Sequence, residues 1–170
     1  MRNKSRFIAH AALIAALYVV LTHFQNLLLP GSASWAIQCR VSEALCVLAL
    51  FTPAAIPGLT VGCLLFNITF AAALPLDWLA GSFATLCATA AMRALQNVRI
   101  MGYPLPAMLM PALFNALLVG WELTVYIGGA FWLNALYVAL GEIIVLLVIG
   151  TLLLYVFEKR GLRKHLFRNR

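Results

Sequence analysis

Charged side chains are scarce in this chain. Asp, Glu, Lys and Arg make up 10% of its 170 residues, and 64% of the residues are hydrophobic, against roughly half in a soluble domain. No charged residue occurs in five long stretches, at 7–39, 44–76, 100–121, 123–141 and 143–157. A soluble fold of this length has no interior large enough to bury so much apolar surface. The sequence therefore excludes that class and predicts an integral membrane protein.

Sequence motifs of catalysis and metal binding are also absent. The four cysteines never form a CxxC pair and have no paired histidines beside them, so we interpret them as small buried hydrophobic residues. Neither a GxSxG, an HExxH nor a Walker A motif occurs. We therefore expect a protein that is not an enzyme, needs no cofactor or metal, and does not hydrolyse ATP by itself.

The net charge of +7 comes mainly from the two ends of the chain. Arg2, Lys4 and Arg6 lie at the start, and six further basic residues lie within 159–170. Basic residues beside membrane spans mark the cytoplasmic side, whereas nucleic-acid binding needs a basic face with aromatic side chains. We therefore expect both termini in the cytoplasm, which requires an even number of crossings.

Apolar segments and the turn residues between them predict six transmembrane helices in a single domain, residues 1–170. The expected helices are 7–29, 38–52, 57–73, 77–96, 106–127 and 132–157. The second and third, separated by Pro53 and Pro57, are shorter than the ~20 residues of a full span, so they are expected to tilt, bend or stop part-way. Arg93 and Arg99 then lie on the cytoplasmic side. The predicted fold is an all-α membrane bundle.

Polar side chains in the predicted helices gather at a similar depth. Five of them come from four helices: Glu43, Asn67, Asn115, Glu122 and Glu142. Glu43, Asn67 and Glu122 lie toward the outer ends of their helices, and Asn115 shares a helix face with Glu122. Glu142 lies near mid-membrane, where a carboxylate costs about 2.5–3.5 kcal/mol unless it is paired, protonated or wetted. We therefore predict one pocket that is open to the exterior. Further candidate residues of this pocket are Trp35, Gln38, Arg40 and Trp121.

Three acids against one arginine make the predicted pocket acidic. Such a pocket suits a cationic or hydrogen-bond-donating aromatic solute, because a carboxylate accepts both the ring N–H and the exocyclic amine of a guanine-like base. We expect Glu43 and Glu142 to hold the base or its amine, and Arg40 to orient Glu43 or to contact a carbonyl oxygen. The two asparagines are expected to read ring edges, and Trp35 or Trp121 to stack on the ring.

Structural roles stay open for most of these side chains. Glu122 and Trp121 are also typical of a membrane interface, in contact with water and headgroups. Arg40 and Glu43 are also typical of an ion pair at a helix end, and the two asparagines of hydrogen bonds between helices. Glu142 is the hardest to explain structurally, because it lies deepest in the membrane.

The first predicted helix carries small residues four positions apart. In HAALIAALYVVLT, Ala11 pairs with Ala15, and Ala12 pairs with Ala16. Two small residues at this spacing let another helix approach closely. The sequence therefore predicts a docking face for a partner helix, with both registers open.

Several segments together resemble the QueT family. The most specific is RVSEAL at 40–45, followed by FTPAAIPGLTVGC at 51–63 and by Asn67. The others occur in the expected order: ALIAALYVVLT near the start, GSFATL at 81–86, PALFNALLVG with Trp121 and Glu122, and ALGEIIV at 139–145. The resemblance covers nearly the whole chain.

QueT proteins are substrate-binding S-components of energy-coupling factor (ECF) transporters. The resemblance implies a six-helix S-component-like bundle in the bacterial cell membrane, with both termini in the cytoplasm. It implies uptake of a queuosine precursor, a 7-deazaguanine such as preQ0, preQ1 or queuine. It also implies the transmembrane coupling subunit EcfT and two ATPase subunits EcfA/EcfA' as partners, with the AxxxA face of the first helix against EcfT. An S-component for another small vitamin or nucleobase, and a structural membrane protein without a solute, are the alternatives.

Overall fold

The computed structural model describes residues 2–30, 32, 39–70, 73 and 76–159. Within these residues the chain is helical, apart from turns and one isolated bridge between Ile100 and Tyr103, and it has no β-strand. The elements in chain order are α1 (Arg2–Leu28), η1 (Val41–Leu50), α2 (Ala55–Thr69), α3 (Asp77–Ala94), α4 (Leu105–Met108), α5 (Met110–Tyr126), α6 (Phe131–Val145), η2 (Leu146–Gly150) and α7 (Thr151–Lys159). The all-α class predicted from the sequence is confirmed.

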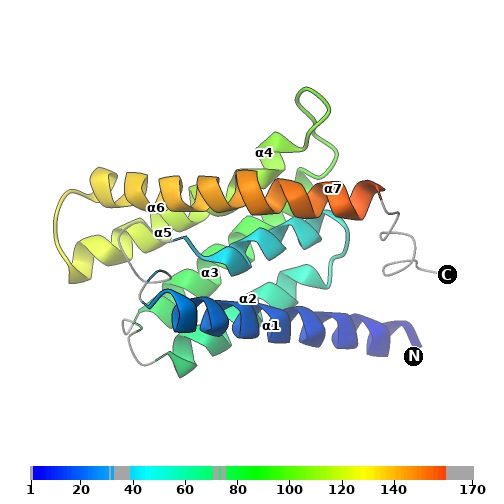
Figure 1. Cartoon of the computed structure of the whole chain (residues 1–170), viewed down its shortest axis with the longest axis horizontal. Helices are drawn as coiled ribbons and strands as arrows, with labels where there is room; N and C mark the ends of the chain where they lie inside the picture. Colours follow the sequence, from blue (N-terminus) through cyan, green and yellow to red (C-terminus); the bar gives the residue numbers. More distant parts are fainter. Residues whose placement is uncertain (1, 31, 33–38, 71–72, 74–75, 160–170) are drawn as a thin grey trace.

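The elements form a bundle of six elongated segments, because α4 leads directly into α5 and because α6, η2 and α7 are continuous. Successive segments run in opposite directions, so α1 begins and α7 ends at the same end of the bundle (Figure 1). Each segment overlaps one of the ranges expected from the sequence. The last break falls at Gly128 and Gly129, whose φ angles of 82° and 86° end α5 and turn the chain into α6.

Three segments are long and apolar enough to cross a membrane: Lys4–Leu28, Leu105–Tyr126 and Phe131–Lys159. Two further apolar helices, Val41–Leu50 and Ala55–Thr69, are shorter. Large apolar side chains are exposed along α1, α5 and α6, as expected of surfaces that face lipid tails rather than water. The structure therefore describes a membrane protein, while the count of six crossings stays a prediction.

The 3₁₀ helix η1 is the central element of the bundle. It contacts α1, α2, α3, α6, η2 and α7, and all its residues except Val41 and Leu45 are buried. Its rise per residue is that of a tight 3₁₀ helix, so its ten residues span about 20 Å. At this length η1 is still shorter than the roughly 30 Å hydrocarbon core of a bilayer, and it faces other helices rather than lipid.

α1 and α2 pack closely, because two glycines of α2 face small residues of α1. A Cβ atom added to Gly58 would lie 2.7 Å from the carbonyl oxygen of Ala11. One added to Gly62 would lie 2.8 Å from Cβ of Tyr18 and 3.0 Å from the carbonyl oxygen of Ala15. Small residues on facing helices are the usual means of close packing between membrane helices. This contact also fixes the position of Tyr18, whose hydroxyl reaches η1.

Gly62→Ala is expected to destabilise the protein by about 1–3 kcal/mol, because the added methyl group meets atoms of α1 that cannot move without shifting the whole helix. Thermal unfolding of the purified protein in detergent measures the effect. Val61→Ala on the exposed side of α2 is the matched control, since Val61 is 45% exposed and its truncation leaves the helix contact intact. Equal melting temperatures for Gly62→Ala and wild type would show that α1 and α2 lie further apart.

Candidate functional site

Four carboxyl side chains lie inside the bundle. They are Glu43 of η1, Asp77 of α3, Glu122 of α5 and Glu142 of α6. None is more than 7% exposed. The first two lie at the starts of their helices and the third near the end of α5, so these three share the end of the bundle that faces away from the start of α1 (Figure 1). Buried carboxylates are costly unless they are compensated, so four of them mark this region as a candidate site.

Glu43 is held by hydrogen bonds to both of its carboxylate oxygens. The Tyr18 hydroxyl donates to Oε1, and the Cys46 thiol lies 3.3 Å from Oε2 as a weak donor. Its backbone N–H donates to the carbonyl oxygen of Arg40 at 3.0 Å, which closes the first turn of η1. Glu43 therefore has a fixed position and orientation, provided by α1 and by its own helix.

Glu142 is held on one side only. The side-chain amide of Asn115 donates to Oε1 at 2.9 Å, and Oε2 is buried without a hydrogen-bond partner among the described residues. The bond crosses from α5 to α6, which approach closely because Gly120 lies against the backbone of Ala135. Glu142 is thus oriented by Asn115 and keeps one oxygen available for a further donor.

Glu122 is paired with a second acid. Its side chain is fully buried and makes a side-chain hydrogen bond with Asp77, in which one carboxyl group is the donor. Within the described part of the chain no N–H or hydroxyl group donates to Oε1 or Oε2. It interacts electrostatically with Asp77 and Arg40. The side-chain amide of Asn67 donates to the carbonyl oxygen of Asp77 at 2.8 Å, which fixes the start of α3. Asp77 is the first residue of α3 and belongs to the acidic cluster, a role that the sequence did not indicate.

Arg40 is the cation of this cluster. Its charge interacts with all four carboxyl groups, and its guanidinium carbon lies 5.8 Å from the centroid of the Phe66 ring. A cation over an aromatic face is stabilised by the ring quadrupole, and more strongly where water is excluded. One guanidinium cannot neutralise four carboxylates. The cluster therefore suits a positively charged solute or bound protons.

A polar stripe on α1 completes the site, and the sequence-based prediction missed it. The hydroxyl oxygens of Thr22 and Ser42 lie 2.7 Å apart. Gln25 donates to the carbonyl oxygen of Cys39 at 2.6 Å and accepts from the N–H of Val41 at 2.7 Å. With Tyr18, the α1 residues are spaced i, i+4 and i+7, which is one face of a helix. That spacing in an otherwise apolar helix was the signal that could have revealed the contact with η1.

The remaining predicted site residues have different surroundings. The side-chain amide of Asn67 donates to the carbonyl oxygen of Asp77, and that of Asn115 donates to Oε1 of Glu142. The side-chain oxygen of Asn67 is buried without a partner among the described residues. Trp121 is 52% exposed, whereas its neighbour Glu122 is buried. Trp35 and Gln38 lie outside the described residues. The stacking role of either tryptophan stays a prediction.

The structure separates the two small-residue registers of α1. Ala15 is buried and Ala11 half-buried against the glycines of α2. Ala12 and Ala16 are exposed on another face of the helix. Of the two registers that the sequence left open, the Ala11 and Ala15 register is therefore covered within the chain, and the Ala12 and Ala16 register is free to meet a partner helix.

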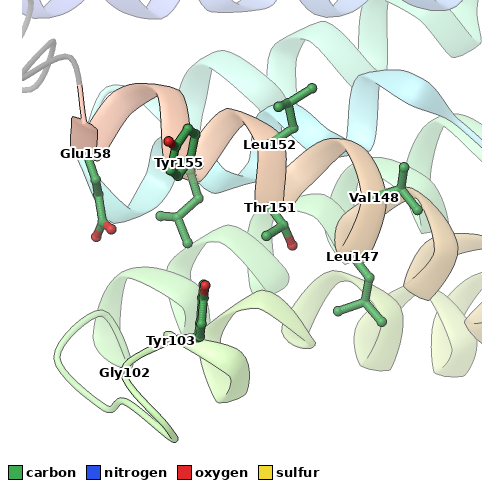
Figure 2. Close-up of a pocket in the computed structure, with 9 residues that line it drawn as sticks. Gly102, Tyr103, Leu147, Val148, Thr151, Leu152, Tyr155 and Glu158 are labelled. Carbon is green, nitrogen blue, oxygen red and sulfur yellow. The ribbon is translucent and has the colours of Figure 1, made fainter.

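Figure 2 shows a groove of about 530 Å³ elsewhere in the molecule, between α7 and the loop that precedes α4. It is lined by Gly102, Tyr103, Leu147, Val148, Thr151, Leu152, Leu154, Tyr155 and Glu158. Its one acid, Glu158, forms a 3.0 Å ion pair with Arg99 and is well exposed. The groove lies toward the end of the bundle where α7 ends, and it contains none of the predicted site residues.

The family model described as QueT transporter matches residues 8–159, which is nearly the whole chain. No curated protein and no solved structure gives a significant match. The family resemblance predicted from the sequence is confirmed.

Proposed function

We propose that this chain, which belongs to the QueT transporter family, is the substrate-binding S-component of an ECF transporter. We propose further that its solute is a 7-deazaguanine precursor of queuosine. Membership of the QueT family makes the chain part of a membrane transporter. The identity of the solute and the ATP-driven partners are our proposal. The observation that supports it is the buried acidic cluster, in which Glu142 keeps one carboxylate oxygen without a donor among the described residues.

The acidic cluster fits the hydrogen-bonding pattern of a guanine-like base. A carboxylate accepts two N–H bonds side by side, and the ring N–H and exocyclic amine of such a base present two donors in that arrangement. We assign this contact to Glu142, which Asn115 orients through a hydrogen bond. In this proposal Arg40 contacts the carbonyl oxygen of the base, while Glu43, fixed by Tyr18, holds the position of η1. A tryptophan stacked on the ring would complete the site.

The direction of binding follows from charge. The basic residues Lys4, Arg6, Arg93, Arg99 and Lys159 lie on elements at the end of the bundle where α1 begins and α7 ends. Basic ends of membrane bundles face the cytoplasm. In our proposal the acidic cluster therefore faces the exterior and captures the solute there.

Transport energy would come from other subunits. The sequence has no nucleotide-binding motif, so we propose that EcfT and the ATPase pair EcfA/EcfA' move the captured solute across the membrane. The exposed Ala12 and Ala16 face of α1 supports this, because it is the small-residue register that α2 leaves uncovered.

A panel of ligands tests the proposed solute. The purified protein is heated with preQ0, preQ1, queuine, guanine, riboflavin or biotin, and its unfolding temperature is recorded. A ligand at a hundred times its Kd stabilises the folded state by about 2.7 kcal/mol, so a specific solute gives a clear upward shift. We expect stabilisation by at least one 7-deazaguanine and none by riboflavin or biotin. Stabilisation by another vitamin instead would assign a different solute, and no stabilisation by any ligand would favour a structural role.

A further inference from the structure

We propose that the groove between α7 and the loop before α4 binds one anionic phospholipid of the surrounding bilayer, with its phosphate at Arg99 and Lys159 and an acyl chain along η2 and α7. The groove lies toward the end of the bundle where α7 ends, away from the starts of η1 and α3 that carry buried acids (Figure 1). The lipid site is therefore separate from the proposed solute site and does not depend on the identity of the solute.

The first argument is the change of polarity along the groove. Figure 2 shows the carboxylate of Glu158 and the hydroxyl groups of Tyr103 and Tyr155 toward one end of it. Leu147 and Val148 lie toward the other end. Tyrosine is typical of the membrane–water interface, where its ring meets hydrocarbon and its hydroxyl meets the headgroups. A groove that is polar at the interface and apolar further into the membrane matches the polarity of a phospholipid.

The second argument is size. The lining residues Leu147 and Glu158 are eleven residues apart on a continuous helix, which corresponds to about 16 Å along its axis. One leaflet contributes about 15 Å of hydrocarbon, half of the bilayer core, so an acyl chain fits the length of the groove. A partner helix about 10 Å wide and equally long takes up about 1,200 Å³. That is more than twice the 530 Å³ of the groove, which favours a lipid chain over a helix.

The third argument is the charge at the polar end. The guanidinium of Arg99 donates to the carbonyl oxygen of Gly102 at 3.1 Å and pairs with Glu158 at 3.0 Å. The ammonium group of Lys159 donates to the Tyr155 hydroxyl and lies 4.9 Å from the centroid of that ring. A guanidinium has five N–H groups and an ammonium three, so both cations have more donors than these contacts use. Two cations beside one acid attract an anionic headgroup, by about fivefold in affinity per basic residue.

The fourth argument is that both walls of the groove are fixed. η2 is a π-helical turn between α6 and α7, and it carries Leu147 and Val148. Single π turns within α-helices are frequent at functional sites. On the opposite wall, the backbone N–H groups of Ile100 and Tyr103 each donate to the carbonyl oxygen of the other, at 2.8 and 3.0 Å. The groove is thus preformed, which distinguishes a lipid site from the general apolar surface of the bundle.

The test measures the binding of single lipids to the full chain in detergent. Native mass spectrometry gives the Kd of dioleoylphosphatidylglycerol, which is anionic, and of dioleoylphosphatidylcholine, which has the same acyl chains and no net charge. We expect wild type to bind the anionic lipid at least tenfold more tightly, since two basic residues act on it. Arg99→Gln and Lys159→Gln should each weaken its binding about fivefold. Arg6→Gln, which removes an exposed charge from α1 at the same end of the bundle, is the matched control and should change it less than twofold.

The apolar part of the groove has a variant of its own. Figure 2 shows the side chain of Thr151 on the side of α7 that faces Tyr103. Thr151→Phe should therefore occupy the space of the acyl chain and weaken binding of both lipids at least fivefold, because the chain loses its apolar contacts. Leu140→Phe, on an exposed part of α6 outside the groove, is its control and should leave both affinities unchanged. Glycerol 1-phosphate, which has the phosphate but no acyl chain, should not displace the lipid.

Several outcomes would overturn the lipid site. Equal affinity of wild type for the two lipids, or a preference that survives in both Arg99→Gln and Lys159→Gln, would remove the two cations from it. An equal loss in Arg6→Gln would assign the preference to the charge of the whole basic end. Displacement by glycerol 1-phosphate would assign the cations to a soluble phosphate, and reduced uptake in Thr151→Phe with unchanged lipid binding would assign the groove to a protein partner. Unfolding temperatures identify any variant that misfolds, and substitutions at both ends of the groove keep the test decisive if one of them does.

Discussion

Replacing Glu142 by glutamine is expected to weaken binding of preQ1 at least tenfold. Glutamine has nearly the same shape, and its side-chain oxygen can still accept the hydrogen bond from Asn115. Its amide nitrogen then takes the place of Oε2 and presents a donor where the carboxylate presented an acceptor. A hydrogen bond to a charged group contributes about 1.5–3 kcal/mol, which corresponds to a factor of ten or more in Kd.

Calorimetric titration of purified protein measures this loss directly. Glu158→Gln is the matched control, because Glu158 is an exposed acid outside the acidic cluster and pairs with Arg99. Both variants should unfold near the wild-type temperature. Unchanged affinity in folded Glu142→Gln would remove this carboxylate from the site and leave its bond to Asn115 as a contact between α5 and α6.

Substitution by leucine at Ala12 or at Ala15 of α1 is expected to impair different properties, which are transport in the first case and folding stability in the second. Ala12→Leu should reduce solute uptake at least tenfold and leave the Kd of the solute within twofold of wild type, because Ala12 is exposed on the face proposed for EcfT. Ala15→Leu should lower the unfolding temperature and weaken binding, because Ala15 is buried against Gly62 and has no space for a larger side chain.

Uptake into proteoliposomes that contain the chain with its ECF module measures transport, and titration of the isolated chain measures binding. The pair of variants makes the comparison informative, since both add the same three carbon atoms to α1. Normal uptake in Ala12→Leu would place the partner on another surface. Normal stability in Ala15→Leu would show that α2 leaves more space beside α1 than the structure describes.

Sequence reasoning located the helices well, because membrane helices follow directly from the lengths of apolar runs. The charge-free stretches and the breaks at Pro53 and Gly128 led to segments that all overlap the observed ones. The tight winding of η1 was not predicted. Composition does not distinguish a buried 3₁₀ helix from a short α-helix, and only the six surrounding elements determine the difference.

The candidate site was predictable in part for a related reason. A carboxylate inside a membrane is unfavourable in free energy and is therefore rare. For that reason Glu43, Glu122 and Glu142 could each be identified from the sequence as candidate site residues. Their partners depend on the rotation of each helix about its axis, which apolar runs do not reveal. Tyr18 and Asp77 were therefore missed, although each interacts with one of these acids.

The winding of η1 also has a mechanical consequence. The same ten residues would be about 5 Å shorter as an α-helix, because the rise per residue falls from about 2.0 to about 1.5 Å. The element that carries Glu43 is thus an extended helix, held by its own backbone hydrogen bonds and by the neighbours around it. A change of η1 to α-helical winding would shift one of its ends by about 5 Å along the bundle, so either Glu43 or the turn at Pro53 would have to move.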